Sequence, residues 1–199
     1  MIRLWIGPGS SSFAPHIALN EIGVPFELVP LSFHRGETRG DEYLALNPAG
    51  KVPTLIDGDL VLTEVLAILF YLARKYPEAG LMPGSGTAGE AQGLAWMSYI
   101  ASAIHPTFGG PPEPTVAAFA VAEQRLGDRE WAVGAHYSIV DIHLFRLFWR
   151  AHHTIGLPRE SLPGLWDHFE RVGERSAVRA TQAAEAALGY ELRGLKLPD

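Results

Sequence analysis

The sequence predicts two domains of different class, an α/β domain followed by an all-helical domain. In the first 77 residues, short apolar runs of strand length alternate with helical patterns in the order β-α-β-α-β-β-α. A glycine-rich stretch without periodicity follows. From residue 90 onward, apolar residues recur at helical spacing. We therefore expect an α/β domain at 1–77, a linker at 78–89 and a helical bundle at 90–199.

The bulk composition narrows the class of protein and of partner. The 199 residues are 47% hydrophobic and 19% charged, with a formal net charge of −6, which is ordinary for a globular chain. There is no basic run, so we expect neither nucleic acid nor a membrane surface as a partner. The longest apolar run, 65–73, is far shorter than the ~20 residues of a membrane helix. The first strand begins almost at Met1, so we expect no signal peptide and a cytoplasmic location.

The chain contains no cysteine. Disulfides, thiolate metal sites and a cysteine nucleophile are therefore excluded. The histidines show no HExxH or similar spacing, and the adjacent His152 and His153 point in different directions on a helix. We expect no metal site.

Within the α/β domain, the first two strands are predicted at Ile2–Ile6 and Phe26–Leu31. A helix at Phe13–Ile22 separates them and ends at Gly23. Because a helix connects the two strands, we expect them to pair in parallel. A short helical turn is predicted at Asp41–Leu46.

A hairpin and a helix complete this domain. Strands at Thr54–Ile56 and Leu60–Leu62 are joined by Asp57-Gly58, a signal for a two-residue type I′ turn. Thr63-Glu64 then begins a helix that is apolar on nearly every face as far as Ala73. Thr63 is the expected N-cap, which leaves the next two amides available to an anion. A helix of this kind must be buried by more than the sheet alone.

The helical domain shows one sharp local signal. Ser138 lies three residues before Asp141, with Tyr137 and Ile142 placed as a hydrophobic staple. This is a capping box, so we interpret Ser138 and Asp141 as structural residues. The predicted helices are Ala91–Ile104, Val116–Leu126, Ile139–His153, Leu165–Arg175 and Ala177–Leu188.

The order of parts from Asn47 to Pro77 resembles the glutathione transferase family: Asn-Pro-x-Gly-x-Val-Pro, a hairpin, an acidic helix start, then Ala-Ile-x-x-Tyr-Leu-Ala. The resemblance implies a thioredoxin-like first domain, a helical second domain and a homodimer. It also implies glutathione as co-substrate, with its thiolate attacking a small electrophile, as in detoxification. The other interpretation of this stretch is a buried hairpin–helix unit without a ligand.

The loop Pro8-Gly9-Ser10-Ser11-Ser12 resembles the bacterial beta class, whose loop reads Pro-Gly-x-Cys-Ser. Ser11 falls at the cysteine and Ser12 at the serine of that loop. The resemblance implies that one of the two hydroxyls donates to the glutathione thiolate, and both remain candidates. Such a bond contributes ~1.5–3 kcal/mol, enough to lower a thiol pKa by about one to two units. Alternatively, the serines only cap the helix that follows.

The resemblance also assigns the peptide-binding residues. Val52 would pair its backbone with the cysteinyl part of glutathione, with Pro53 in the cis form. Glu64 would hold the γ-glutamyl ammonium, and the Val65 amide the γ-glutamyl carboxylate. Val65 departs from the family, which commonly has serine or glycine there, so a hydroxyl is lost and bulk is added.

The cations nearest the expected glycyl carboxylate are His34, Arg35 and Lys51, unless they are simply solvated surface charges. His105 ends Tyr99-Ile-Ala-Ser-Ala-Ile-His, which resembles the beta-class Asn-Tyr-Ile-Ala-x-x-x-His. In that class the histidine faces the thiol. The alternative is a polar residue that ends the helix before Pro106.

Together these features predict a glutathione transferase that activates the thiol of glutathione for attack on a small electrophile. The alternative is a non-catalytic relative that uses the fold for binding or interaction. Val65 and the missing loop cysteine favour the alternative, whereas Val52-Pro53 and Glu64 favour the enzyme. The resemblance covers the whole chain and is weakest between His105 and Trp131, where the electrophile would be selected.

Overall fold

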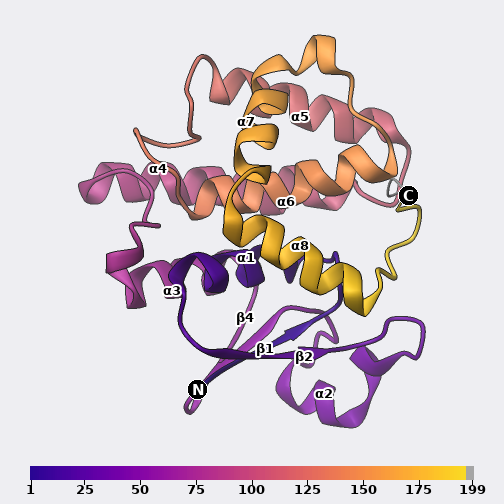
Figure 1. The fold of residues 1–199 in the computed structure, drawn as a ribbon. Coiled ribbons are helices and arrows are strands. Elements are labelled where there is room, and N and C mark those ends of the chain that lie inside the picture. Colours follow the sequence, from indigo (N-terminus) through magenta and orange to yellow (C-terminus); the bar gives the residue numbers. More distant parts are fainter. Residues whose placement is uncertain (196–199) are drawn as a thin grey trace. The chain divides into compact units, whose positions relative to one another are not determined.

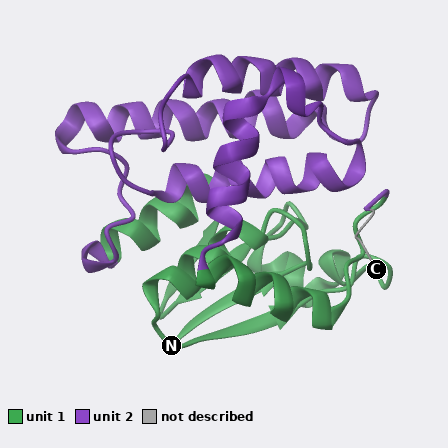
Figure 2. Ribbon diagram, turned by 45° about the horizontal axis from the view of Figure 1, so that its top comes forward, with its two compact units in different colours: residues 1–75, 176–193 green, residues 76–175, 194–199 purple. Residues whose placement is uncertain are grey.

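The computed structural model describes residues 1–195. By its internal contacts the chain divides into two compact units (Figure 2). Unit 1 comprises Met1–Lys75 and Ser176–Arg193, and unit 2 comprises Tyr76–Arg175 with residues 194–195. Unit 1 is an α/β unit and unit 2 is helical, so the predicted fold class is confirmed.

Unit 1 contains a four-stranded mixed sheet in the order β2-β1-β3-β4 (Figure 1). The strands are β1 (Ile2–Ile6), β2 (Phe26–Pro30), β3 (Thr54–Asp57) and β4 (Leu60–Thr63). β1 and β2 are parallel, as the helix between them predicts, and the other two pairs are antiparallel. β1 is one of the two inner strands, and its C-terminal end leads into the loop that begins at Gly7.

Helices cover both faces of this sheet. α1 (Phe13–Ile22) packs against α3 (Val65–Lys75), and α2 (Asp41–Leu46) lies on the opposite face (Figure 1). A cluster of Trp5, Tyr43, Val52 and Ile56 forms the core on the α2 side. A 3₁₀ turn at Glu37–Arg39 precedes α2.

The last helix, α8 (Ser176–Leu188), packs against α1. The sequence predicts residues 90–199 as one helical domain, whereas the contacts group 176–193 with the first 75 residues. The reason lies in the face that α8 buries. Thr181 and Glu185 are completely buried, and both bond to residues of α1 or of the loop before it.

The turn between β3 and β4 differs from the prediction by one residue. Asp57 is still in the ladder, paired with Leu60, so the two loop residues are Gly58 and Asp59. Gly58 has φ of 60°, and Glu64 is the only non-glycine residue with positive φ among residues 1–195. Positive φ at the first loop residue alone is typical of a type II′ turn rather than type I′. The Asp57 carboxylate, at the end of β3, accepts a 2.8 Å hydrogen bond from Tyr71 Oη.

The start of α3 also differs from the prediction. Thr63 pairs with Thr54 in the sheet, which keeps its backbone extended. The Glu64 carbonyl accepts the first helical hydrogen bond, 3.0 Å from the Ile68 nitrogen. Thr63 is therefore not the N-cap as predicted, because the sheet extends through it and Glu64 takes that position.

Unit 2 is built around α6 (Ile139–Thr154), which is buried along most of its length. α4 (Gly86–Tyr99) continues into a π-helical turn at Ile100–Ile104. α5 begins at Pro112, four residues earlier than predicted, because proline is accepted in the first turn of a helix. α5 ends at Leu126, and α7 spans Pro163–Gly173. Short 3₁₀ turns lie at Pro77–Ala79, His105–Thr107 and Arg159–Ser161. No helix within residues 1–195 has the length and hydropathy to cross a bilayer.

The predicted capping box begins α6. The Ser138 hydroxyl accepts a hydrogen bond from the Val140 amide at 3.2 Å, and Asp141 Oδ2 accepts one from the Ser138 amide at 2.8 Å. Asp141 Oδ1 also accepts from the Ala132 amide at 2.8 Å and lies 2.9 Å from His168 Nε2. The completely buried Asp141 thus fixes the helix start, the segment before it and α7 at one point.

Candidate functional site

The loop that follows β1 presents two neighbouring serines in different environments. Ser11 is partly exposed, and its hydroxyl donates a hydrogen bond of 2.8 Å to the Val52 carbonyl. Ser12 is completely buried, and its hydroxyl is 3.2 Å from both the carbonyl and the amide of Gly7. Ser12 makes no side-chain cap to α1. The Ser11 hydroxyl is therefore accessible, whereas the Ser12 hydroxyl is used inside the loop.

A buried carboxylate from α8 anchors the same loop. Glu185 Oε2 accepts a hydrogen bond of 2.6 Å from the Gly9 amide, and Glu185 Oε1 lies 2.8 Å from His16 Nδ1. Gly9 has φ of +75°, and a Cβ there would lie 2.7 Å from the Tyr190 ring. Only glycine fits this position. Burial and the nearby Glu185 carboxylate raise the pKa of Tyr190 to about 12, so it stays protonated at neutral pH.

The loop before β3 is held by two side chains from α2 and its end. Tyr43 Oη and Asn47 Nδ2 both donate to the Lys51 carbonyl, each at 2.6 Å. The Val52–Pro53 peptide is cis, as predicted. Val52 is buried, and its carbonyl faces Ser11. Two of the predicted site residues, Ser11 and Val52, are thus brought into direct contact.

Glu64 combines exposure with backbone strain. Its φ of 69° is in the left-handed region, which costs a non-glycine residue ~1–3 kcal/mol. The first-turn amides of α3 follow it directly, and such amides have no partner within the helix. An exposed carboxylate and a set of anion-binding amides therefore occur together. This arrangement suits a ligand group that carries both an ammonium and a carboxylate.

The predicted cations are not equally available. Arg35 Nε lies 2.8 Å from Glu37 Oε1, and this bond raises the pKa of the Arg35 guanidinium. The His34 amide donates to Glu191 Oε2 at 3.0 Å, and its ring is exposed. Lys51 is exposed.

A further cation, Arg39, lies near the loop before β3, and no sequence motif points to it. Arg39 Nη1 donates to the Ala49 carbonyl at 3.3 Å, and its side chain lies close to Gly50. It therefore lies on the loop that leads to Lys51 and Val52. The tertiary fold, rather than any local pattern, places it there.

His105 belongs to unit 2, in the 3₁₀ turn His105–Thr107. Its ring meets Phe108 edge to face, with ring centroids 6.5 Å apart. Nearby, burial lowers the pKa of His143 to about 3, helped by the positive charges of Arg146 and His105. The predicted position of His105 opposite the thiol stays a prediction.

Known protein families account for both units. The model of the glutathione S-transferase N-terminal domain matches residues 1–74, and that of the C-terminal domain matches residues 114–176. Glutathione S-transferase GstA of Escherichia coli O157:H7 is 32% identical over 199 residues, covering 92% of this chain and 98% of the relative. The chain belongs to the glutathione S-transferase family. A second member, GST-4.5 of Xanthomonas campestris, is 30% identical over 92% of this chain and 98% of its own length.

Solved structures of the family agree over almost the whole chain. A glutathione S-transferase from Xylella fastidiosa superposes with a TM-score of 0.85 at 30% identity, covering 94% of this chain and 99% of that one. A sphingomonad glutathione S-transferase complexed with glutathione has a TM-score of 0.82 at 33% identity, with 92% and 98% covered. The beta-class enzyme of Sphingomonas chungbukensis has a TM-score of 0.79 at 34% identity, with the same coverage.

Proposed function

We propose that this chain, a glutathione transferase by family, activates glutathione through the hydroxyl of Ser11. The observation that carries this proposal is the 2.8 Å hydrogen bond from Ser11 Oγ to the Val52 carbonyl. Val52 is the residue whose backbone would pair with the cysteinyl part of glutathione. A hydroxyl that already reaches this peptide group is close to the position where the cysteinyl sulfur would lie. Ser11 would thus replace the cysteine of the beta-class loop.

Ser11 is favoured over Ser12 by access. The Ser12 hydroxyl is completely buried and satisfied by both polar groups of Gly7. Releasing it would leave buried backbone groups without partners, at a cost of ~1–3 kcal/mol. Ser11 only exchanges one acceptor, the Val52 carbonyl, for another, the thiolate. We therefore assign Ser12 to the support of the loop.

The γ-glutamyl end of glutathione would bind at the start of α3. Glu64 would accept hydrogen bonds from the ammonium, and the amides of Val65 and the next residue would donate to the carboxylate. The sphingomonad relative is described in complex with glutathione, and so is a homologue from Sulfitobacter at 28% identity. These complexes support glutathione as the ligand of the fold.

The glycyl carboxylate would meet the loop at Lys51. Arg39 lies on the same loop through its bond to Ala49, so we add it to the predicted cations. Arg35 would first have to leave Glu37, and His34 has Glu191 at 3.9 Å from its ring. A pair of cations, Lys51 and Arg39, therefore fits the glycyl end best.

The reaction would be nucleophilic attack by the glutathione thiolate on an electrophilic carbon of a small molecule. The thiol proton leaves to solvent, a carbon–sulfur bond forms, and a leaving group departs with its electron pair or an activated double bond takes up the electrons. The chain has no cysteine, so no mixed disulfide between protein and glutathione can form. The Ser11 hydroxyl would stabilise the anion without forming a bond to sulfur. The role of His105 stays a prediction from its sequence motif.

Homodimerisation also belongs to this proposal. Leu60 and Val61 on β4 are 38% and 44% exposed, and much of α3 is only half-buried. A second copy of the chain would bury this apolar surface. Light scattering at micromolar concentration tests it, and a species of only 21.7 kDa would contradict it. A cytoplasmic location stays a prediction from the sequence.

The second candidate function is a glutathione-binding protein without turnover. The side chain of Val65, half-buried at the start of α3, favours it, because the family commonly has serine or glycine there. Calorimetric titration with glutathione, combined with a conjugation assay using an aryl halide, separates the two. Binding with turnover supports the transferase, and binding without turnover supports the second candidate. Absence of binding contradicts both.

A further inference from the structure

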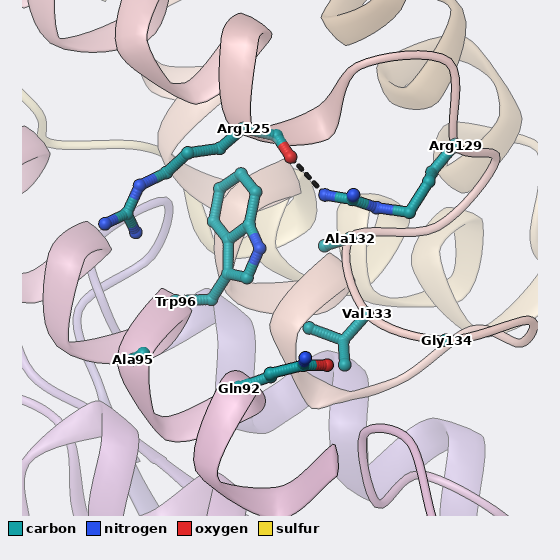
Figure 3. Close-up of a pocket in the computed structure, with 8 residues that line it drawn as sticks. All are labelled: Gln92, Ala95, Trp96, Arg125, Arg129, Ala132, Val133 and Gly134. Atoms are coloured by element: carbon teal, nitrogen blue, oxygen red, sulfur yellow. Dashed lines mark hydrogen bonds between the residues drawn. The ribbon is translucent and has the colours of Figure 1, made fainter. Parts of the chain in front are cut away.

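Unit 2 contains a cavity of about 320 Å³ between α4, the end of α5 and the segment before α6 (Figure 3). None of its lining residues belongs to the proposed glutathione site. The lining residues are Gln92, Ala95, Trp96, Arg125, Arg129, Ala132, Val133 and Gly134.

The wall of this pocket is aromatic and aliphatic. Trp96 is 6% exposed, and its ring rises between the two arginine side chains in the view of Figure 3. Ala95, Ala132 and Val133 complete an apolar surface around it. The volume is at the lower end of the range for small-molecule sites. A single planar ring system is therefore the ligand body that the pocket suits.

Two guanidinium groups stand at this apolar surface. The Arg125 guanidinium lies over the rings of Tyr99 and Trp96, 4.3 and 5.6 Å from their centroids. Within residues 1–195 its side chain has no hydrogen bond or ion pair to another residue. The Arg129 guanidinium donates to the Arg125 main-chain carbonyl (Figure 3) and has no carboxylate partner in the described part of the chain.

The pair differs in this respect from two other arginines of unit 2. Arg159 lies 2.5 Å from Glu170, and Arg171 lies 3.8 Å from Glu130. The whole protein carries a formal charge of −6, so two cations without a carboxylate partner at one pocket form a local concentration of positive charge. A guanidinium that stacks on an aromatic ring keeps its donor edge directed outward, which is the geometry that recognises a carboxylate.

We propose that this pocket binds a small aromatic carboxylate. The ring system lies against Trp96 and Val133, and the carboxylate accepts hydrogen bonds from Arg129 on that side of the Trp96 ring. The Arg125 guanidinium, on the other side of the ring, adds a second positive charge (Figure 3). The pocket requires both parts of the ligand. A neutral aromatic compound leaves the guanidinium groups without an acceptor, and a simple inorganic anion leaves the apolar wall uncovered.

The test is calorimetric titration of the full-length protein with 2-naphthoate, and with 2-naphthamide as the matched neutral compound. We expect 2-naphthoate to bind with one site per chain, and 2-naphthamide to bind at least about tenfold more weakly. Arg125→Gln and Arg129→Gln should each weaken 2-naphthoate by roughly tenfold and leave 2-naphthamide unchanged. Ala95→Phe, which fills the pocket from an exposed position, should weaken both compounds.

The control variant is Arg159→Gln. Arg159 is also exposed and also lies over a tryptophan, Trp166, at 5.3 Å, but outside the pocket. The variant Arg159→Gln should therefore leave 2-naphthoate binding unchanged. Saturating glutathione and Glu64→Ala should likewise have no effect, which separates this site from the glutathione site. The proposal is overturned if 2-naphthoate does not bind, if 2-naphthamide or inorganic phosphate binds equally well, or if both arginine variants retain the affinity.

Discussion

The Glu185 carboxylate accepts a hydrogen bond of 2.6 Å from the Gly9 amide, and the two residues are 176 positions apart in the chain. The same carboxylate lies 2.8 Å from His16 Nδ1, and all these groups are buried. The last helix thus supports the loop that carries Ser11. The loop's conformation depends on a residue from the other end of the chain.

Glu185→Ala should lower the free energy of unfolding by about 3–5 kcal/mol, because it leaves His16 and the Gly9 amide buried without an acceptor. Urea unfolding measures the effect. Arg179→Ala, on the exposed side of the same helix, is the control and should change stability by less than about 0.5 kcal/mol. Equal stability of Glu185→Ala and the wild type would show that the loop does not depend on this carboxylate.

His143 should make the protein less stable in mild acid. Burial lowers its pKa to about 3 in the folded protein, so the folded state does not take up the proton that the unfolded state binds near pH 6.5. The stability is therefore complete above pH 6.5 and is lost as the pH falls from there toward 3. Lowering the pH from 7.5 to 5 should therefore reduce the free energy of unfolding by about 2 kcal/mol through His143.

The variant His143→Leu tests the origin of this loss. It removes the titrating group, so its unfolding free energy should change less between pH 7.5 and 5 than that of the wild type, whatever its absolute stability. Urea unfolding at both pH values provides the comparison. Identical pH dependence in the two proteins would assign the loss to other groups.

Replacing Glu64 with glycine should weaken glutathione binding without lowering stability. Glu64→Gly removes a side chain from a residue with φ of 69°, so the unfolding free energy should rise or stay level. Glutathione binding should weaken by about 1–3 kcal/mol, because the carboxylate that meets the ammonium is lost. Thermal unfolding and calorimetry measure the two quantities. Unchanged affinity would remove Glu64 from the site.

Val65→Ser should strengthen glutathione binding by up to about 1 kcal/mol, the usual net contribution of one neutral hydrogen bond. The new hydroxyl would stand beside the first-turn amides of α3, where the γ-glutamyl carboxylate is expected. Calorimetry with wild type and variant in the same buffer measures the difference. Weaker binding in Val65→Ser would mean that the carboxylate lies elsewhere.

Local signals in the sequence predicted much of this fold. The capping box at Ser138 and Asp141 and the parallel first pair of strands depend on neighbouring residues or on one crossover, and both are confirmed. The sequence also predicts the hairpin but places its turn one residue too early. Asp-Gly marks a turn, but the register of the strands decides which two residues form it, and Asp57 is retained by the sheet.

The candidate site could be predicted only in part. Ser11, Val52 and Glu64 follow from a motif, and the contact between Ser11 and Val52 joins two of its parts. Glu185, Tyr190 and Arg39 carry no local pattern that points to the site. Their contacts with the loops arise from tertiary packing, across separations of up to 176 residues for Glu185 and Gly9.

The most direct test of the central claim is a titration of the thiolate absorbance of bound glutathione in the wild type and in Ser11→Ala. If Ser11 exchanges the Val52 carbonyl for the thiolate, the bound thiol should have a pKa about one to two units lower in the wild type than in Ser11→Ala. The affinity for glutathione should be nearly the same in the two proteins. The turnover of Ser11→Ala should be lower than that of the wild type near neutral pH, and this difference should shrink at alkaline pH. Coincident titration curves for the two proteins would contradict the role of Ser11.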